Sequence, residues 1–130
     1  MLRVTRLDHF GVDVADLGRA ERFYTGLLGM TVEMRLPDQV LLRYGDGNCA
    51  LFLKRDRAPG GLEQIENPLG KSHHAFEVSY EDLRRALELF KAEGVPHHAP
   101  IDWDDHDCLY FLDPDGNLLE LVGYRQAAAR

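Results

Sequence analysis

The chain has 130 residues, with 15 basic and 22 acidic side chains, a formal net charge of −7, and a composition that is 45% hydrophobic and 28% charged. This length and composition predict one globular domain with a sizeable core rather than a disordered chain. An acidic chain with no basic run, no apolar run near the ~20 residues of a membrane-spanning helix and no signal-peptide pattern predicts a cytoplasmic protein without a nucleic-acid or membrane partner.

The first half of the chain predicts a strand, a helix and three further strands. Residues 7–14 alternate between apolar and polar side chains, as a half-buried strand does. Apolar positions then recur at helical spacing until Gly29, a helix stop signal, with Asp16 as a candidate N-cap. The last two strands flank an Asp-Gly pair, which is a strong hairpin signal. The three strand-like runs are 30–35, 40–44 and 49–53.

The second half repeats this order. Residues 72–78 resemble residues 7–14, and a helical pattern that starts at a candidate N-cap, Asp82, ends at Gly94. An Asp-Pro-Asp-Gly-Asn turn separates the last two strand-like runs. The three runs are 97–101, which is weak, 108–112 and 118–122.

The repeat divides the domain into two modules. Residues 5–54 form the first module and residues 72–125 the second, and residues 55–71, rich in Gly, Pro and charge, form the linker. Each module has the order strand, helix and three strands, which predicts an α+β fold rather than a run of parallel βαβ units. A helix covers one face of each sheet, so the other face must line a cavity or meet the second module.

The two cysteines, Cys49 and Cys108, each lie in an apolar segment. The sequence alone leaves a disulfide open. We favour two buried free thiols in a reducing cytosol.

Alternation along the strands assigns two histidines to the open faces of the sheets. The apolar side chains of residues 10–14 pack under the helix, which leaves His9 on the open face. In the second module the apolar side chains of residues 76–78 are in phase with His74. His73, and not His74, is therefore the expected counterpart of His9.

The last strand adds a carboxylate to the same face. Leu119 and Leu121 face the helix, so Glu120 faces the cavity, where a carboxylate is costly to bury unless it is paired or binds a metal. Counting from the Asp-Gly-Asn turn makes Leu51 the counterpart of Glu120 in the first module. Two histidines and one carboxylate are thus expected on one concave surface, with an apolar residue at the fourth symmetric position.

Two histidines and one carboxylate with open positions are typical of the facial triad of non-haem Fe(II) enzymes. Two neutral imidazoles and one anion hold a divalent ion and leave room for substrate and for oxygen or water. Taken singly, His9 reads as an ordinary histidine at a sheet edge and Glu120 as an exposed edge-strand residue. Their occurrence with His73 at equivalent positions of the repeat favours a metal site.

The motifs around these residues resemble the vicinal oxygen chelate superfamily, which includes glyoxalase I, fosfomycin and bleomycin resistance proteins, and extradiol ring-cleaving dioxygenases. His9 lies in Leu-Asp-His-Phe-Gly-Val-Asp-Val, His73 in His-His-Ala-Phe-Glu-Val, and Glu120 ends Tyr-Phe-Leu-Asp-Pro-Asp-Gly-Asn-Leu-Leu-Glu. The resemblance spans residues 7–124. It implies two βαβββ modules that form a cupped mixed sheet, usually completed in a homodimer, with His9, His73 and Glu120 as the metal ligands.

The resemblance also bears on the reaction. Leu51 stands where glyoxalase I relatives often have a fourth ligand, which argues against that chemistry and makes Leu51 an expected substrate-binding residue. Bleomycin-binding members lack the metal ligands that this chain has. Ring-cleaving dioxygenases have a tyrosine ten positions before the ligating glutamate, and Tyr110 stands ten positions before Glu120. Tyr110 is therefore an expected catalytic residue.

Three further residues complete the predicted site. His106 lies in an acidic loop and is an expected acid or base, although such a loop is also typical of a solvated turn. Trp103 in the same loop is expected to bind substrate. Arg43, predicted on the open face of the first module, is a substrate-binding candidate whose alternative role is a salt bridge to Asp13 or Glu77.

Three functions remain open at this point. The first is a dioxygenase-like enzyme that uses Fe(II) on a small substrate with vicinal oxygens. The second is an isomerase, a lyase or a resistance-type thiol transferase that uses Mn(II), Ni(II) or Zn(II). A dianionic phosphonate would find little support, because no Lys, Arg, Ser or Thr occurs between Lys91 and Arg125. The third is a metal-free protein that binds a small molecule.

Overall fold

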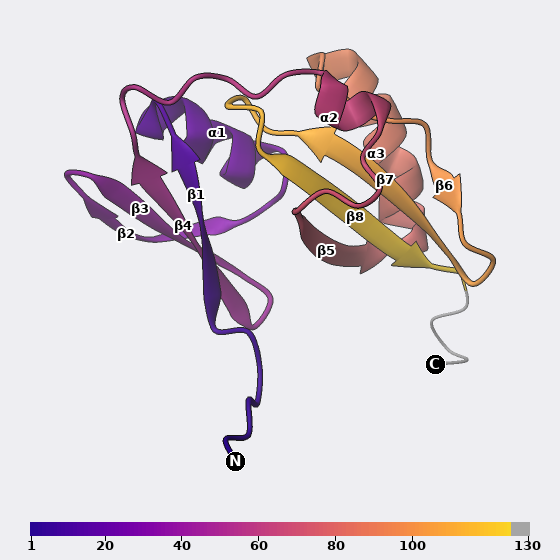
Figure 1. Ribbon diagram of the computed structural model, residues 1–130, viewed down its shortest axis with the longest axis horizontal. Helices are drawn as coiled ribbons and strands as arrows, with labels where there is room; N and C mark the ends of the chain where they lie inside the picture. The colour runs from indigo at the N-terminus through magenta and orange to yellow at the C-terminus, as the bar shows by residue number, and fades with distance from the viewer. Residues whose placement is uncertain (126–130) are drawn as a thin grey trace. The chain divides into compact units, whose positions relative to one another are not determined.

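The computed structural model describes residues 1–125, which divide into two units, Met1–Pro59 and the residues from Gly60 on. Each unit contains one four-stranded sheet, which confirms the α+β fold of two repeated modules. The first unit contains β1 (His9–Val14), α1 (Leu17–Gly26), β2 (Thr31–Leu36), β3 (Gln39–Tyr44) and β4 (Gly47–Leu53) (Figure 1). The second unit contains α2 (Glu63–Glu66), β5 (His74–Ser79), α3 (Tyr80–Glu93), β6 (Ile101–Asp102), β7 (His106–Leu112) and β8 (Leu118–Tyr124).

The two sheets have the same topology. Their strand orders are β1-β4-β3-β2 and β5-β8-β7-β6. In each sheet the first strand of the unit pairs in parallel with the last, and the other pairs are antiparallel. β4 and β8 thus lie inside their sheets, which explains why both are nearly continuous apolar runs. The parallel pair brings the start of each unit beside its end.

The helix α1 begins as predicted. The side chain of Asp16 accepts a hydrogen bond from the backbone N–H of Arg19 at 3.0 Å, so Asp16 is the N-cap. Ala20 and Tyr24 are fully buried, and α1 packs on β3 and β4. The side chain of Tyr24 is thus part of the first unit's core.

The helix α3 begins earlier than predicted, and its cap is Ser79 rather than Asp82. The Ser79 side chain accepts from the backbone N–H of Asp82 at 3.0 Å. Ser79 ends β5 in an extended conformation, which is the backbone that an N-cap needs, and Asp82 lies in the first turn, where a negative charge favours the helix. The predicted end is confirmed, because Gly94 closes the helix with a φ of 68°.

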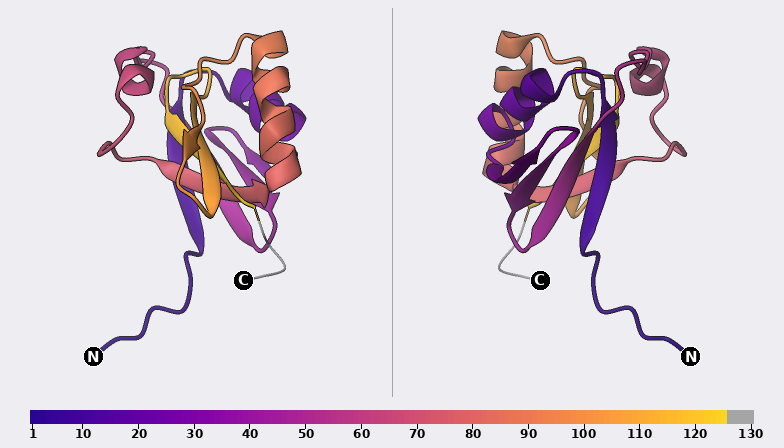
Figure 2. Two further views of the ribbon diagram at one scale, coloured as in Figure 1. Left: turned by 90° about the vertical axis from the view of Figure 1, so that its right-hand side faces the viewer. Right: turned by 90° about the vertical axis from the view of Figure 1, so that its left-hand side faces the viewer.

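The second sheet has a helix on each face (Figure 2). On one face α3 buries Leu83 and Phe90, and the rings of Phe90 and Phe111 lie 4.7 Å apart. On the other face Ile65 of α2 packs in a cluster of buried residues that includes Tyr110. The remaining members of that cluster are Cys108, Leu112 and Leu118, with Ile101 and Val122 packed against it. The short helix α2 lies in the stretch that the sequence analysis expected to be a linker.

Both cysteines are buried, and neither forms a disulfide within residues 1–125, as predicted. Cys49 lies in β4 and Cys108 in β7. Within residues 1–125, none of the helices is long and apolar enough to cross a membrane.

The loop between β7 and β8 is held by a buried aspartate. Asp113 is 3% exposed, and its Oδ1 accepts from the backbone N–H groups of Asp115 and Asn117, both at 2.9 Å. Its Oδ2 accepts from the side-chain amide of Asn117 at 2.8 Å. Gly116 has a φ of +79°, which favours glycine. The Asp-Pro-Asp-Gly-Asn motif is thus a structural turn that sets the start of β8.

Replacement of Asp113 should therefore destabilise the protein. In Asp113→Ala the two backbone N–H groups lose their buried acceptor, and we expect a loss of about 2–4 kcal/mol in the free energy of unfolding. Urea unfolding followed by circular dichroism measures it. Asp113→Asn, which keeps one oxygen acceptor, is the matched control and should lose less. Equal unfolding midpoints for Asp113→Ala and the wild type would show that the carboxylate does not hold the loop.

Candidate functional site

His73 and Glu120 meet in the second unit, on the face of the sheet opposite α3. His73 directly precedes β5, and in the parallel register Ala75 pairs with Glu120, so the side chains of all three residues lie on one side. The Nε2 atom of His73 lies 2.9 Å from Oε1 of Glu120. The side chains of His73 and Glu120 are 25% and 11% exposed. We call these two residues, which the sequence predicts to be metal ligands, the ligand pair.

The other ring nitrogen of His73 reveals the proton arrangement. Nδ1 lies 2.7 Å from the backbone carbonyl oxygen of Lys71. A carbonyl only accepts, so Nδ1 must carry a hydrogen, and in a neutral imidazole Nε2 then has a lone pair. That lone pair faces the carboxylate of Glu120, which is also an acceptor. Two acceptors at this distance need a positive charge between them, either a proton or a metal ion.

The spacing of the ligand pair fits a metal ion. Nitrogen and oxygen ligands lie about 2.1 Å from a divalent ion such as Zn²⁺. Two such donors at the right angle of octahedral coordination are therefore about 3.0 Å apart, close to the observed 2.9 Å, which is also the length of an ordinary N–H···O hydrogen bond. Among residues 1–125 no group of three or more His, Cys, Asp or Glu side chains is gathered closely enough to hold a metal. The ligand pair alone thus supplies two of the three predicted ligands.

His9, the third predicted ligand, lies in the first unit at the start of β1. Its side chain is 59% exposed, and Nδ1 lies 2.9 Å from Oδ2 of Asp8. This hydrogen bond, and then the charge of Arg6, lower the pKa of the Asp8 carboxyl. An ionised Asp8 holds the hydrogen on Nδ1 and leaves Nε2 as the donor atom, as carboxylate partners do for metal-binding histidines. The part of His9 in a metal site stays a prediction.

Tyr110 lies beside the ligand pair. It pairs with Glu120 in the antiparallel register of β7 and β8, and its ring meets the ring of His73 edge-on, with centroids 5.1 Å apart. Burial, followed by the charge of Glu120, raises the pKa of the Tyr110 phenol. At neutral pH the phenol is therefore protonated and able to donate a hydrogen bond.

His74 lies on the opposite face from His73, as strand alternation predicts. It pairs with Leu119, which is fully buried in the core. Partial burial, and then the charge of His73, lower the pKa of the His74 ring. His74 is therefore a neutral, half-buried histidine outside the ligand pair.

The predicted orientation of Leu51 is wrong. Leu51 pairs with Val12 and with Val40, so all three point to the buried side of the first sheet. Leu51 is 0% exposed. It belongs to the core of the first unit and does not line an open face, so it is not a substrate-binding residue.

The counterpart of Glu120 is Ala50. Ala50 pairs with Gly11 in the first sheet as Glu120 pairs with Ala75 in the second. Counting from the turn failed because the first hairpin turns over two residues, whereas the second uses the longer loop 113–117. A difference of one residue moves a side chain to the other face.

Arg43 lies on the open face of the first sheet, as predicted. It pairs with Asn48, which in turn pairs with His9, so the three side chains form a row across β3, β4 and β1. Arg43 Nη2 lies 2.5 Å from Oε1 of Glu33, and the Asn48 amide donates to Oε2 of Glu33 at 2.8 Å. Glu33 sits at a register shift between β2 and β3. The ion-pair partner of Arg43 is thus a carboxylate that the sequence analysis did not consider.

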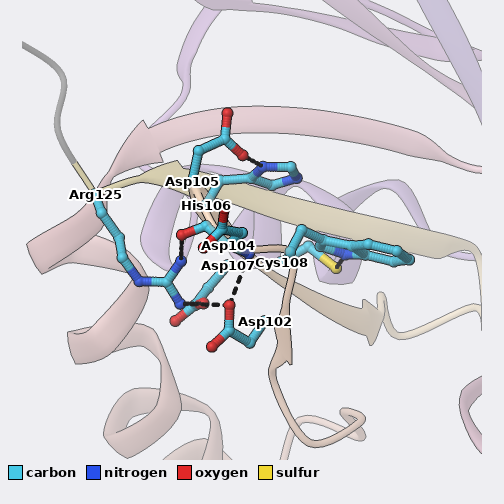
Figure 3. Close-up of polar contacts among 8 residues, drawn as sticks. Asp102, Asp104, Asp105, His106, Asp107, Cys108 and Arg125 are labelled. Atoms are coloured by element: carbon cyan, nitrogen blue, oxygen red, sulfur yellow. Dashed lines mark hydrogen bonds and ion pairs between the residues drawn. The ribbon is translucent and has the colours of Figure 1, made fainter. Parts of the chain in front are cut away.

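His106 lies at the other end of β7, among the aspartates of the acidic loop (Figure 3), and its ring stacks with that of Trp103. His106 is on the same side of β7 as Tyr110 but four residues away, which corresponds to about 13 Å. Its Nδ1 lies 2.6 Å from Oδ1 of Asp105, and its ring lies 6.5 Å from the ring of Trp103 and 4.9 Å from that of Tyr124. The structure thus joins the two predicted residues to each other and not to the ligand pair.

The acidic loop is tied by Arg125, which the sequence analysis did not single out. Arg125 donates to the backbone carbonyl of Asp104 at 2.5 Å and forms ion pairs with Asp102, at 3.1 Å, and with Asp107. Its backbone N–H donates to the carbonyl of Asp105 at 3.0 Å. A loop with this many aspartates needs a cation, and that charge balance was the available signal.

Cys108 is not available as a ligand. Burial raises the pKa of its thiol to about 11, so the sulfur stays protonated at neutral pH. The indole N–H of Trp103 donates to Sγ at 3.1 Å. The thiolate is the form that binds metals, and Cys108 therefore acts as an apolar residue.

Comparison with known proteins agrees with this architecture. The family model of the Glyoxalase/Bleomycin resistance protein/Dioxygenase superfamily matches residues 6–121. The glutathione transferase FosA of Serratia marcescens is 31% identical over 128 residues, which cover 95% of this chain and 87% of FosA. Biphenyl-2,3-diol 1,2-dioxygenase 3 of Rhodococcus globerulus is 26% identical over 117 residues, which cover 89% of this chain but 62% of that protein.

A solved structure shows the same fold. The genomically encoded fosfomycin resistance protein FosX from Listeria monocytogenes superimposes with a TM-score of 0.76 at 19% identity, over 93% of this chain and 94% of FosX. The matched range includes the motifs around His9, His73 and Glu120. The chain therefore belongs to the glyoxalase/bleomycin resistance protein/dioxygenase superfamily.

Proposed function

We propose that this protein is a divalent-metal-dependent enzyme that acts on a small molecule with two neighbouring oxygens, which chelate the metal. The single observation that carries the proposal is the ligand pair, whose two acceptor atoms lie 2.9 Å apart with the hydrogen of His73 on the outer nitrogen. His9 is the third ligand in this proposal. The superfamily relatives named above are a transferase and a dioxygenase, both enzymes.

The chain's own residues support this chemistry around a metal. A bound divalent ion would act as a Lewis acid that stabilises negative charge on the chelated oxygens. The Tyr110 phenol would donate a hydrogen bond to one of these oxygens. The apolar cluster around Tyr110 lowers the local polarity, which strengthens both interactions.

A dioxygenase-like reaction with Fe(II) is the branch that we favour. Two histidines and one carboxylate are the ligand set of non-haem Fe(II) oxygenases. Tyr110 stands ten positions before Glu120 and lies against His73. The relative from Rhodococcus globerulus is named for a diol of biphenyl.

A thiol transferase, a lyase or an isomerase with Mn(II), Ni(II) or Zn(II) is the second candidate. Its support is the similarity to FosA, which extends over most of the length of both chains. Against a phosphonate substrate, Arg43 is already paired with Glu33. A metal-free binding protein is the third candidate, in which a proton on Nε2 of His73 would make the contact with Glu120 an ordinary hydrogen bond.

Metal and oxygen separate these candidates. The protein is purified without oxygen, its metal content is measured, and the metal-free form is loaded separately with Fe(II), Mn(II), Ni(II) and Zn(II). Oxygen uptake with a panel of catechols supports the first candidate. Turnover of a thiol with an electrophile, or of a hemithioacetal, without oxygen uptake supports the second. A protein that binds none of these ions supports the third and contradicts the proposal.

The ligand set predicts a specific pattern of metal loss. His9→Ala, His73→Ala and Glu120→Ala should each remove most of the bound metal, because two remaining ligands hold the ion poorly. His74→Ala is the matched control, since its ring lies on the other face, and it should keep the metal. Equilibrium dialysis with elemental analysis measures binding, and circular dichroism checks folding. Metal loss in His74→Ala with retention in His73→Ala would exclude the ligand pair.

Tyr110→Phe should fold and keep its metal but turn over more slowly. A donor aimed at developing negative charge commonly contributes ~2.7–4 kcal/mol to the barrier, which corresponds to about 10²–10³-fold in kcat. The retained ring should preserve KM better than kcat. Steady-state kinetics on the first substrate found will decide, and an unchanged kcat with intact metal content would remove Tyr110 from the mechanism.

We also expect a homodimer, because each sheet has a face that its long helix does not cover and because the resemblance implies pairing. Sedimentation velocity at micromolar concentration measures the oligomeric state. A stable monomer that still binds its metal would contradict this expectation.

A further inference from the structure

The segment Gly60–Lys71, which we call the clasp, joins the loop in front of β8 to the residues in front of β5. At its start the Gly60 N–H donates to the Asp115 carbonyl at 2.9 Å, and the Gln64 side chain donates to the Gly116 carbonyl at 2.7 Å. Gly60 and Gly116 pack backbone to backbone, so that a Cβ atom on either would overlap the other. The clasp is therefore anchored to the turn from which β8 starts.

At the other end of the clasp, Lys71 binds two backbone carbonyls of the same segment. The ammonium group of Lys71 donates to the backbone carbonyls of Asn67, at 2.7 Å, and of Glu63, at 3.0 Å. Asn67 is the C-cap of α2, and its backbone N–H also donates to the Glu63 carbonyl, at 3.3 Å, so Lys71 adds a second donor to that carbonyl. Lys71 thereby ties its own backbone to α2, and its backbone carbonyl is the acceptor for Nδ1 of His73.

The middle of the clasp packs under the site. Ile65, 8% exposed, contacts the cluster that contains Tyr110 and Leu118. The clasp thus touches the strand of Tyr110, the turn before Glu120 and the ring of His73.

We propose that the clasp positions the ligand pair, with Lys71 and Gln64 as the positioning residues. Lys71 holds the carbonyl that keeps the hydrogen of His73 on Nδ1 and aims Nε2 at Glu120. Gln64 ties the same segment to the turn 113–117, from which β8 starts, and β8 contains Glu120. The inference rests on the proposed metal site. It states that Lys71 and Gln64, which are not among the proposed ligands, control the metal affinity.

Outer partners of metal-binding histidines are worth about 10–100-fold in metal affinity. In Lys71→Met the ammonium group is lost, so the carbonyl of residue 71 is no longer tied to α2. We expect the affinity of the full-length protein for Co(II), a spectroscopic probe, to fall by about tenfold or more. Gln64→Leu should weaken binding in the same direction.

Two variants serve as controls. Lys71→Arg can still donate to the same carbonyls and should restore most of the affinity. Lys91→Met removes an exposed lysine from the last turn of α3, a comparable position in another helix, and should leave the affinity unchanged. Thermal unfolding of each metal-free variant, followed by circular dichroism, shows how much of the protein is folded at the temperature of the titration.

A second readout does not need the metal. In the metal-free protein the hydrogen on Nδ1 of His73, bound to the Lys71 carbonyl, should exchange slowly with water and be visible by ¹H–¹⁵N NMR. Lys71→Met should speed its exchange, whereas Lys91→Met should not. This measurement separates orientation of the ring from general stability.

The outcomes are distinguishable. If the wild type does not bind Co(II), the proposed function fails, and the exchange of the His73 ring hydrogen still tests the clasp. If the wild type binds Co(II), His73→Ala does not, and folded Lys71→Met binds as the wild type does, the clasp has no positioning role. If Lys71→Met is unfolded, Gln64→Leu decides. Weaker Co(II) binding by folded Gln64→Leu than by the wild type supports the inference, and wild-type affinity in folded Gln64→Leu overturns it.

Discussion

The site depends on the contact between Nε2 of His73 and a carboxylate oxygen of Glu120. With Nδ1 bound to the Lys71 carbonyl, His73 directs Nε2 at Glu120, and a proton or a metal ion must supply the positive charge between these two atoms. In water such a contact would separate, but here the parallel pairing of β5 and β8 fixes the backbones on both sides. The surrounding apolar cluster makes an uncompensated charge costly. In the proposed function a bound cation would supply the positive charge that this contact needs.

Much of the arrangement within each unit follows from local rules. Strand alternation predicted that His73 and not His74 faces Glu120 and Tyr110, because a side chain's face depends only on its position along the strand. The helices and their approximate ends follow from the spacing of apolar residues and from Gly94. The parallel pairing of each first strand with the last strand is different, since it depends on contacts between residues far apart in sequence.

The sequence predictions that the structure corrects were wrong, or incomplete, for physical reasons that can be named. Leu51 was assigned to the wrong face because two hairpins that look alike differ in turn length, and one residue inverts a strand. Ser79 replaced Asp82 as the cap because β5 runs directly into α3. The clasp was missed because a four-residue helix has no detectable period, and its hydrogen bonds go to a turn some fifty residues away.

The predicted site residues of the two units also differ in their exposure to solvent. Glu120 and Tyr110 are enclosed, so a substitution there disturbs packing as well as chemistry. His9 and Arg43 are exposed, and changes at such positions usually alter stability by less than about 0.5 kcal/mol. Substitutions at exposed positions of the first unit therefore cost less stability than substitutions at Glu120 or Tyr110. In a repeated fold of this kind the two copies can therefore diverge in sequence at unequal rates.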